Sequence, residues 1–395
     1  MERVTNILVE CPDLLPSVRV GVLNPLKPLI DKKKCNVMFK KTLEIKKKEI
    51  LWCDVLICVR GCELASLKVV KAARDAGRYI IYFLDDDLLD VPNNIDSSVY
   101  FSSKSIKDNL VSCLTNADLL WCVNPLIGQK YSRYCHNTVT LRVPSIIDVD
   151  YYKDESEYIN ILYAGSKDHE KGVKEFVSPA LDMLCKEFNS KIKVTSIGAD
   201  LGLSHHKNYI HHKYIDNYDV YREYVTKGNF NIGIAFVRNE EFYKYKYYNK
   251  YIEYTSIGSV GIYSNLEPYI FVIKDRFNGI LCKNTVDDWY NKLKDLIIDS
   301  ELRKHCYINA KANISEEFRL EIVSKELETL IPQITSYFAL AKSEKDIRLP
   351  NLILICYIQT FKYLIKKYGV LVIFIAPYKI VKKIFRKFFV VEEKK

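Results

Sequence analysis

Glycine and proline are scarce in this chain, with 14 and 12 residues among 395. We therefore expect no long flexible linkers. Hydrophobic residues make up 48% of the chain and charged residues 27%, which is the composition of a globular rather than a disordered protein. The chain is long enough for two domains of ordinary size, each with its own buried core.

A secretory leader and a regular cysteine spacing are also lacking. The opening residues MERVTNILVECPDLL place no basic segment before a long apolar run, so we expect no signal peptide. The twelve cysteines are spread irregularly, and we expect reduced, mostly buried thiols in a cytoplasmic protein. Cys58 and Cys62 lie four residues apart, but no second pair with zinc spacing accompanies them, so no metal site is expected there.

The net charge of +10 is unevenly distributed. From Phe361 onward the chain reads FKYLIKKYGVLVIFIAPYKIVKKIFRKFFVVEEKK, in which basic residues alternate with large apolar ones. The apolar runs 352–358 and 370–376 are too short to span a bilayer. We therefore expect residues 346–395 to be a tail that binds an anionic membrane surface rather than nucleic acid, with a helix packed on the enzyme or on a partner as the alternative.

Short apolar runs that suit buried strands alternate with segments of helical spacing. Such alternation predicts an α/β protein with parallel sheets, and a charged stretch without periodicity at 148–158 suggests a domain boundary. We expect an N-terminal Rossmann-like domain over 1–150 and a second one over 151–345. The predicted strands are 6–10, 54–59, 78–84, 119–123, 139–144, 160–165, 191–197, 230–236 and 260–263.

In open parallel sheets, ligands bind beyond the carboxyl ends of the strands. Two such domains predict a ligand site in a cleft between them. The pattern by itself also fits a dehydrogenase, a kinase or an epimerase.

The segment 250–264, KYIEYTSIGSVGIYS, narrows this choice. It resembles the donor-binding segment of retaining GT-B glycosyltransferases of family 4 ("group 1"), in which a helix carrying a glutamate precedes a glycine turn and a strand. Lys250, Glu253 and Gly258 match that spacing. The strand end at Gly165 followed by Lys171-Gly172 resembles the first strand and "KG" loop of the donor domain. The resemblance spans about residues 5 to 335 and is strongest from 230 to 306.

The resemblance implies transfer of a sugar from a nucleotide-diphosphate donor with retention and without a metal ion. It assigns to Glu253 the hydrogen bonds from the ribose hydroxyls. Lysines and backbone amides would stabilise the charge that grows on the departing diphosphate. The candidate donor-binding residues are Gly165, Ser166, Lys171, Lys250, Glu253 and Gly258, and the candidate catalytic residues are Lys246, Glu253 and Asp86.

One position departs from the family pattern. These enzymes usually carry a second glutamate eight residues before the first, contacting the donor sugar, and this chain has Tyr245 there. Either Glu240 or Glu241 substitutes for it, or the sugar is held differently. A catalytically silent GT-B subunit that scaffolds a membrane glycan-assembly complex therefore stays open as an alternative, as does a non-hydrolysing nucleotide-sugar epimerase.

Two clusters invite a metal interpretation. The aspartates 85–87 suit Mg²⁺, but GT-B enzymes generally need no metal, so we place Asp86 on the acceptor side instead. The histidine pairs 205–206 and 211–212 could bind zinc or nickel, but with no cysteine or carboxylate pair nearby in the sequence we favour a non-metal role. Arg19 and Arg60, near strand ends, are candidates for contacts with acceptor or phosphate, although such arginines more often lie simply at the surface.

The sequence thus predicts a hexosyltransferase-like enzyme that extends a glycan, which we expect to be lipid-linked, in cell-surface polysaccharide synthesis. We expect it in the cytoplasm, peripheral at the inner face of the plasma membrane.

Overall fold

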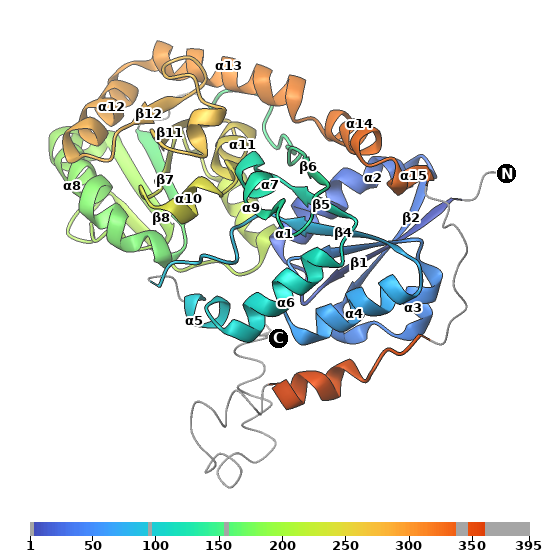
Figure 1. The fold of residues 1–395 in the computed structure, drawn as a ribbon. Helices are drawn as coiled ribbons and strands as arrows, with labels where there is room; N and C mark the ends of the chain where they lie inside the picture. The colour runs from blue at the N-terminus through green and yellow to red at the C-terminus, as the bar shows by residue number, and fades with distance from the viewer. Residues whose placement is uncertain (1–3, 94–96, 154–157, 337–346, 360–395) are drawn as a thin grey trace, which may run out of the picture. The chain divides into compact units, whose positions relative to one another are not determined.

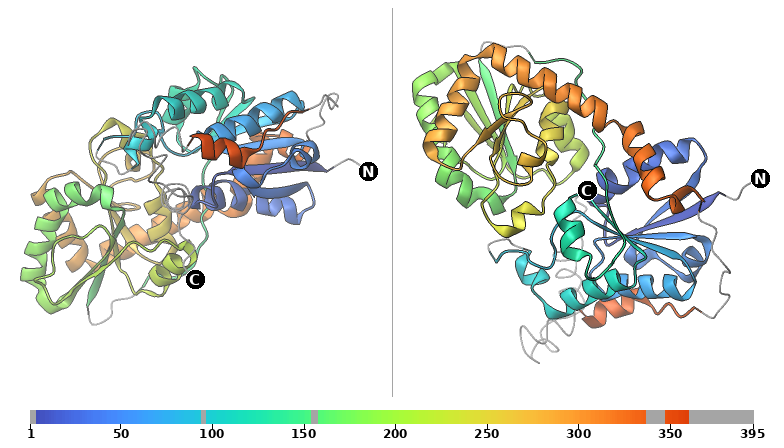
Figure 2. Two further views of the ribbon diagram at one scale, coloured as in Figure 1. Left: turned by 90° about the horizontal axis from the view of Figure 1, so that it is seen from below. Right: turned by 45° about the horizontal axis from the view of Figure 1, so that its top comes forward.

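A computed structural model describes residues 4–93, 97–153, 158–336 and 347–359. These residues form two compact units. Unit 1 comprises the chain up to Leu89, Tyr100–Leu141 and the described residues from Ser324 onward, and unit 2 comprises Asp90–Val99 and Arg142–Val323. Each unit is built on a six-stranded parallel sheet with helices on both sides (Figures 1 and 2).

The sheet of unit 1 has the strand order β2-β1-β3-β4-β5-β6. The chain starts in β1, crosses to β2 at one edge, and then returns past β1 to run outward from β3 to β6. This order reverses between β1 and β3, which makes that position the topological switch point of the sheet. The strands are β1 (Thr5–Cys11), β2 (Cys35–Lys41), β3 (Val55–Val59), β4 (Tyr79–Leu84), β5 (Leu119–Cys122) and β6 (Thr138–Thr140).

Helices cover both faces of this sheet because its central strands are apolar on both sides. β3 reads VLICV and is buried along its whole length. Its helices are α1 (Pro16–Val18), which leads through a π turn (Arg19–Leu23) into α2 (Asn24–Asp31), then α3 (Lys47–Trp52), α4 (Leu64–Asp75), α6 (Lys104–Thr115), α7 (Pro125–Tyr131) and α15 (Gln333–Ser336). A 3₁₀ turn, η2 (Thr42–Glu44), precedes α3, and α5 (Ser98–Phe101) lies where the chain passes between the units.

The sheet of unit 2 has the order β12-β11-β10-β7-β8-β9, with the reversal between β7 and β10. This is the six-stranded order of a dinucleotide-binding Rossmann sheet. Its strands are β7 (Ile159–Gly165), β8 (Ile192–Gly198), β9 (Tyr209–His212), β10 (Ile232–Ala235), β11 (Val260–Ser264) and β12 (Ile280–Cys282).

Two long helices of unit 2, α8 (Glu170–Phe188) and α12 (Val286–Ile298), lie side by side on one face of this sheet (Figure 1). They share a core in which Trp289 is fully buried, and the Thr285 side chain caps the first turn of α12. The other helices are α9 (Tyr218–Lys227), α10 (Glu241–Lys244), α11 (Asn249–Ser256) and α13 (Ser300–Glu317), with short 3₁₀ turns η3 (Lys167–His169), η4 (Asn189–Lys191) and η5 (Tyr269–Phe271).

The predicted fold class, two Rossmann-like parallel sheets, agrees with these two sheets. Three strands, β2, β9 and β12, escaped prediction. β2 lies at a sheet edge and β9 carries two exposed residues, so neither shows the continuous apolar run of a central strand, and β12 is only three residues long. Between β1 and β2 the helical segment is divided by the π turn, which precedes Pro25 and Pro28.

The chain returns to unit 1 earlier than the predicted boundary at 345. Helix α14 (Leu320–Leu330) leads out of unit 2, and Glu328 on it pairs with Lys34 of unit 1 at 2.6 Å. Helix α15 then packs against β1. The first boundary falls at 141–142 rather than near 150. These positions depend on contacts between distant segments, so no local pattern marks them.

The predicted membrane-binding tail lies almost wholly outside the described residues. Of its length, the structure describes 347–359, where 352–359 form a helix with Ile353, Leu354 and Ile358 about half exposed. Within the described ranges, no helix combines the length and the apolar character needed to cross a bilayer.

Candidate functional site

The carboxyl edge of the unit 2 sheet ends in two paired glycines, Gly165 of β7 and Gly198 of β8. Gly198 has φ +91°, and a Cβ added there would lie 2.1 Å from the carbonyl oxygen of Gly165. Only glycine fits this backbone conformation and this spacing. The last residues of the two strands thus carry no side chain, and β7 lies beside the switch point of the sheet.

Helix α8 begins directly beyond β7. Ser166 is extended and its Oγ donates to Asp168 Oδ2 at 3.2 Å, after which η3 leads into the first turn of α8. Lys171 in that turn is exposed, whereas Gly172 is buried against Phe236, where an added Cβ would lie 2.5 Å from the ring. The positive end of the dipole of this 19-residue helix, with Lys171 in its first turn, forms an environment suited to an anion.

Helices α9 and α11 bring a carboxylate, an ammonium and a phenol together at the same edge. Lys250 and Glu253 lie one turn apart on α11, with Nζ 2.6 Å from Oε1. Tyr221, in the first turn of α9, donates to the same Oε1 at 2.5 Å, and Lys250 Nζ donates to the Tyr221 oxygen at 3.0 Å. Burial and the charge of Glu253 raise the pKa of Tyr221, so the phenol stays a donor.

The Lys250–Glu253–Tyr221 cluster is partly open to solvent. The side chains of Lys250 and Glu253 are each 24% exposed. The hydrogen bonds from Tyr221 and Lys250 both use Oε1 of the carboxylate. An ionised carboxylate has acceptor capacity on both oxygens, so Oε2 can accept hydrogen bonds from a bound hydroxyl-bearing ligand.

An exposed aromatic ring, Tyr214, lies between this cluster and the ends of the strands. It belongs to the loop from β9 to α9, is 61% exposed, and its ring would contact a Cβ added to Gly198 at 3.4 Å. Partial burial, Asp216 and Glu253 together raise the pKa of Tyr214. Sequence reasoning singled out neither Tyr214 nor Tyr221. With 29 tyrosines, only their place between a strand end and a helix start could have marked them.

Gly258 lies elsewhere in unit 2. It ends α11 with φ +82° and precedes β11, which puts it at the amino edge of the parallel sheet. An added Cβ would lie 2.9 Å from the carbonyl oxygen of Tyr151. The predicted tight turn is therefore present, but its close approach is to Tyr151 and not to the edge that holds Gly165. This corrects the placement of Gly258 among the donor-binding residues.

Tyr245 ends the short helix α10 and donates to Glu241 Oε1 at 3.2 Å. Glu241 also pairs with Lys244 at 2.9 Å, while Glu240 pairs with Arg238 at 3.2 Å. Both acidic residues that could replace the missing glutamate thus have cationic partners. Lys246 lies with Nζ 4.7 Å from the centre of the Phe242 ring, a cation–π contact.

In unit 1, Arg60 follows β3 and faces two of the three aspartates that follow β4. Its Nη1 lies 3.1 Å from Asp85 Oδ1 and 3.4 Å from Asp86 Oδ2. Burial alone would lower the pKa of Arg60, but these two carboxylates raise it. Asp87 is buried and accepts from Lys130 at 2.5 Å and from the Tyr131 hydroxyl at 2.6 Å.

The aspartates 85–87 are therefore held by cations. The group of potential metal ligands found among the described residues lies elsewhere and does not include them. Arg60 also donates to Ser17 Oγ at 3.3 Å, which ties this carboxyl edge to the start of α1, next to the π turn that Arg19 opens.

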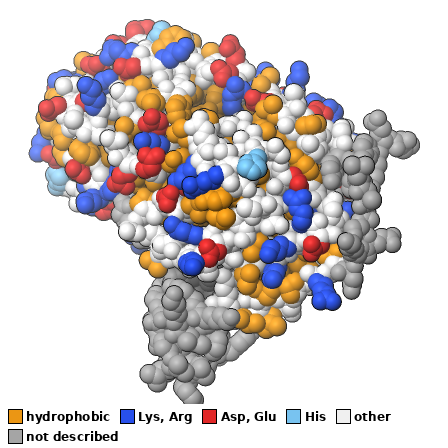
Figure 3. Space-filling model, viewed as in Figure 1, with side chains coloured by type: hydrophobic (Ala, Val, Ile, Leu, Met, Phe, Trp, Pro, Cys, Tyr) orange, Lys and Arg blue, Asp and Glu red, His pale blue; other side chains and the backbone are white. Residues whose placement is uncertain are grey.

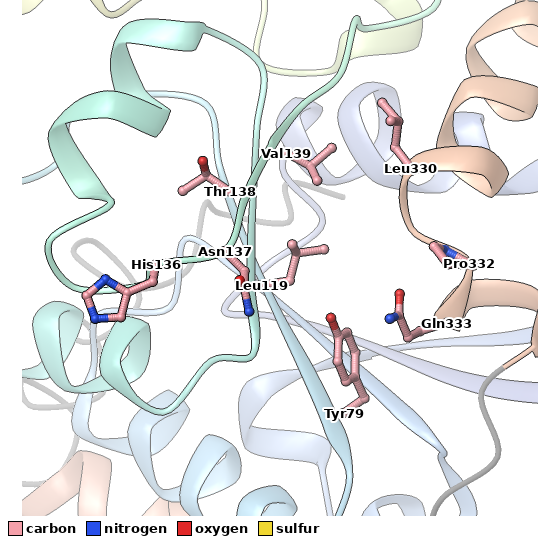
Figure 4. A pocket seen from close by; sticks show the side chains of 9 residues that line it. All are labelled: Tyr79, Leu119, His136, Asn137, Thr138, Val139, Leu330, Pro332 and Gln333. Atoms are coloured by element: carbon pink, nitrogen blue, oxygen red, sulfur yellow. The ribbon is translucent and has the colours of Figure 1, made fainter.

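A pocket opens at the opposite edge of the same sheet (Figure 4). Tyr79, Leu119 and Thr138 line it from the first residues of β4, β5 and β6. None of the candidate site residues lines it, and ligands of parallel sheets bind at the carboxyl edge, so this pocket is not the candidate site.

On the face shown in Figure 3, basic and acidic side chains are intermixed over the described surface. The net positive charge of the chain is therefore not gathered into one patch on that face.

No protein-family model matches the chain, and no curated protein matches it. Solved structures do. The Anabaena protein Alr3699/HepE in complex with UDP and glucose aligns with a TM-score of 0.62 and 12% identity over 83% of this chain and 100% of that one. Sucrose-phosphate synthase from Thermosynechococcus elongatus aligns with a TM-score of 0.61 and 12% identity over 84% of this chain and 99% of that one. TarM aligns with a TM-score of 0.53 and 12% identity over 70% of this chain and 54% of that one.

At these identities the likeness establishes the fold. The chain has the two-domain GT-B fold of these glycosyltransferases, as the sequence predicted.

Proposed function

We propose that the chain is a glycosyltransferase that takes a sugar from a nucleotide-diphosphate donor. The observation that carries the proposal is the Lys250–Glu253–Tyr221 cluster, which lies at the carboxyl edge of a Rossmann sheet beside paired glycines and a helix start. A dinucleotide-binding sheet receives its ligand at this position.

Each part of the donor is assigned to the group whose charge or hydrogen-bonding capacity complements it. The diphosphate lies at the Gly165-Ser166 turn and the first turn of α8, where backbone amides and Lys171 meet it. The ribose hydroxyls donate to Glu253, whose carboxylate is oriented by Lys250 and Tyr221. The base stacks on the exposed ring of Tyr214.

Uridine is the base to test first, because the aligned structures of HepE hold UDP or UDP-glucose and a trehalose-6-phosphate enzyme structure from E. coli holds UDP-2-fluoro glucose. A hexose is the corresponding sugar.

Transfer proceeds by stabilisation of the leaving diphosphate. As the sugar–oxygen bond breaks, negative charge grows on the departing phosphate oxygen, and Lys171, Lys246 and Lys250 with the amides of α8 stabilise it without a metal ion. A retaining, front-face reaction needs no protein base.

The acceptor binds at the carboxyl edge of the unit 1 sheet. Asp85 and Asp86, held by Arg60 and about one-fifth exposed, are placed to accept hydrogen bonds from sugar hydroxyls. A lipid-linked glycan in cell-surface polysaccharide synthesis is the acceptor we propose. Its support is the basic and apolar sequence from residue 361 onward together with the exposed Ile353 and Leu354 just before it.

A second candidate, a catalytically silent GT-B subunit, is favoured by one observation. Tyr245 replaces the glutamate that contacts the donor sugar in the resembled family, and Glu240 and Glu241 are engaged by Arg238 and Lys244. Such a subunit would bind the nucleotide but transfer no sugar.

The test is a thermal-shift panel of nucleoside diphosphates and nucleotide sugars on the wild type and on Glu253→Ala. A ligand of the folded state raises Tm by an amount that grows with its concentration over Kd. We expect UDP to raise Tm in the wild type and not in Glu253→Ala. UDP-sugar turnover then separates an enzyme from a silent subunit, and no shift with any nucleotide would contradict both.

A further inference from the structure

Two adjacent histidines and an aspartate converge on one point of unit 2, remote from the candidate donor site. His205 Nε2 and His206 Nε2 both lie 2.7 Å from Oδ1 of Asp182. The three ligand atoms lie within 4.8 Å of one another, and the two imidazole centres are 4.2 Å apart. This is the group of three potential metal ligands that the described part of the chain contains.

The aspartate and the histidines come from different elements. Asp182 lies on α8, and the histidines lie 23 and 24 residues later in the connection from β8 to β9. The sequence favoured a non-metal role because no cysteine or carboxylate pair lies near the histidines along the chain. The fold brings the Asp182 carboxylate to them from a distant helix.

The connection holds the histidines firmly over α8. Leu201 and Leu203 are buried in the same core as α8, at 1% and 2% exposure. The Tyr209 hydroxyl accepts from the Leu201 amide at 3.0 Å and donates to Asp200 at 2.8 Å, and the His206 amide donates to the Leu203 carbonyl at 2.9 Å. The backbone that carries the two histidines is therefore held over α8 before any ion arrives.

We propose that Asp182, His205 and His206 bind a divalent transition-metal ion, with Zn²⁺ as the best fit. Two imidazoles and one carboxylate form a common zinc ligand set, with distances of about 2.0–2.2 Å and a tetrahedral arrangement that leaves one position for water. Such a geometry separates ligand atoms by about 3.3 Å, so each nitrogen must move away from Oδ1 by about 0.6 Å. His205 is 57% exposed and has room to rotate.

One charge opposes the ion. Lys186 lies one turn further along α8 and donates to the other oxygen of Asp182 at 2.6 Å. Its ammonium stabilises the ionised carboxylate, which metal binding requires, but also repels a cation near the same group. Lys186 therefore lowers the affinity of the site without blocking Oδ1.

A bound ion cross-links the β8–β9 connection to α8 and does not take part in sugar transfer. Asp182 is the thirteenth residue of α8, about 18 Å along the helix axis from its first turn at 1.5 Å per residue. The expected effect is on the stability of unit 2, and the site is compatible with metal-independent transfer.

The test uses the full chain without an affinity tag, first treated with a chelator and then titrated with ZnCl₂. Calorimetry measures the affinity, and thermal unfolding measures the change in Tm. We expect a single site and a rise in Tm with Zn²⁺, and no rise with MgCl₂. His205→Ala, an exposed position, should lose at least tenfold in affinity. The matched control is His305→Ala, which removes an exposed histidine on α13. This variant should bind Zn²⁺ with the affinity of the wild type.

Lys186→Gln should change the affinity for Zn²⁺ in the opposite direction to His205→Ala. Removing the ammonium from Asp182 should tighten Zn²⁺ binding several-fold, whereas a purely structural hydrogen-bonded cluster would only lose Tm. Failure of Zn²⁺ to bind the wild type, or equal affinities of His205→Ala and His305→Ala, would overturn the proposal.

Discussion

Lys250 Nζ lies 2.6 Å from Glu253 Oε1, one turn apart on α11, and the hydroxyl of Tyr221 from α9 closes a triangle with both. Lys250 and Tyr221 both donate to Oε1, which fixes the orientation of the carboxylate before a ligand binds. Preorganisation of this kind lowers the cost of ordering side chains on binding.

Tyr221→Phe tests that orientation. The change removes the phenol donor to Glu253 and leaves the Lys250 ion pair, so the carboxylate is held by one partner instead of two. We expect the Kd for UDP to rise about 3- to 10-fold, the cost of one hydrogen bond of about 1 kcal/mol. Isothermal titration measures it. Tyr224→Phe, on the same helix but bonded to His212, is the control and should leave the Kd unchanged.

Tyr214→Ala tests the base platform. Loss of base stacking costs about 1–3 kcal/mol by alanine substitution, so the Kd for UDP should rise about 5- to 150-fold. Tyr214→Phe keeps the ring and should bind UDP as the wild type does. Tyr151→Ala removes a tyrosine that is 66% exposed beside Gly258, at the other edge of the sheet, and serves as the control. Equal binding by Tyr214→Ala and the wild type would remove Tyr214 from the site.

Gly198→Ala tests the close approach of the two strand ends. The new Cβ would lie 2.1 Å from the Gly165 carbonyl oxygen, and φ +91° is unfavourable for alanine. We expect a loss of several degrees in Tm together with loss of UDP binding. Gly202→Ala also has positive φ, +72°, but its Cβ meets only the flexible Lys174 side chain at 3.7 Å. It should therefore lose about 1 kcal/mol of stability and retain UDP binding.

Arg60→Met tests the charge balance at the carboxyl edge of unit 1. Asp85 and Asp86 would face each other without their shared cation, and we expect a loss of about 1–3 kcal/mol of unfolding free energy at pH 7. Urea titrations at pH 7 measure the difference from the wild type. Arg74→Met, which breaks the more exposed pair with Asp118, should cost less than 1 kcal/mol.

Lys153 gives the stability of the protein a dependence on alkaline pH. It is buried, donates to the carbonyls of Thr226 and Gly228, and burial lowers its pKa to about 8 from 10.5. Between pH 8 and 10.5 the unfolded chain binds the proton more tightly than the folded chain, so this group adds stability as the pH rises. The Tm of the wild type minus that of Lys153→Met should therefore increase from pH 7.5 to pH 10. A constant difference would contradict the lowered pKa.

The sequence determined the fold class. Buried parallel strands are continuous apolar runs, so segments such as 55–59 and 159–165 can be recognised as strands, and their alternation with helices predicts a doubly wound arrangement. The family resemblance singled out Lys250 and Glu253, and their contact follows from local spacing, because three residues on a helix put two side chains on one face.

Tertiary structure alone decided which distant residues meet. Tyr221 joins Glu253 from 32 residues away, Asp182 joins His205 from 23, and Arg60 joins Asp86 across two strand ends. It also moved Gly258 to the amino edge, because a helix between two parallel strands returns the chain to the opposite end of the sheet. Local periodicity records which face of an element is buried, whereas the partners across that face depend on strand order, which no short stretch of sequence encodes.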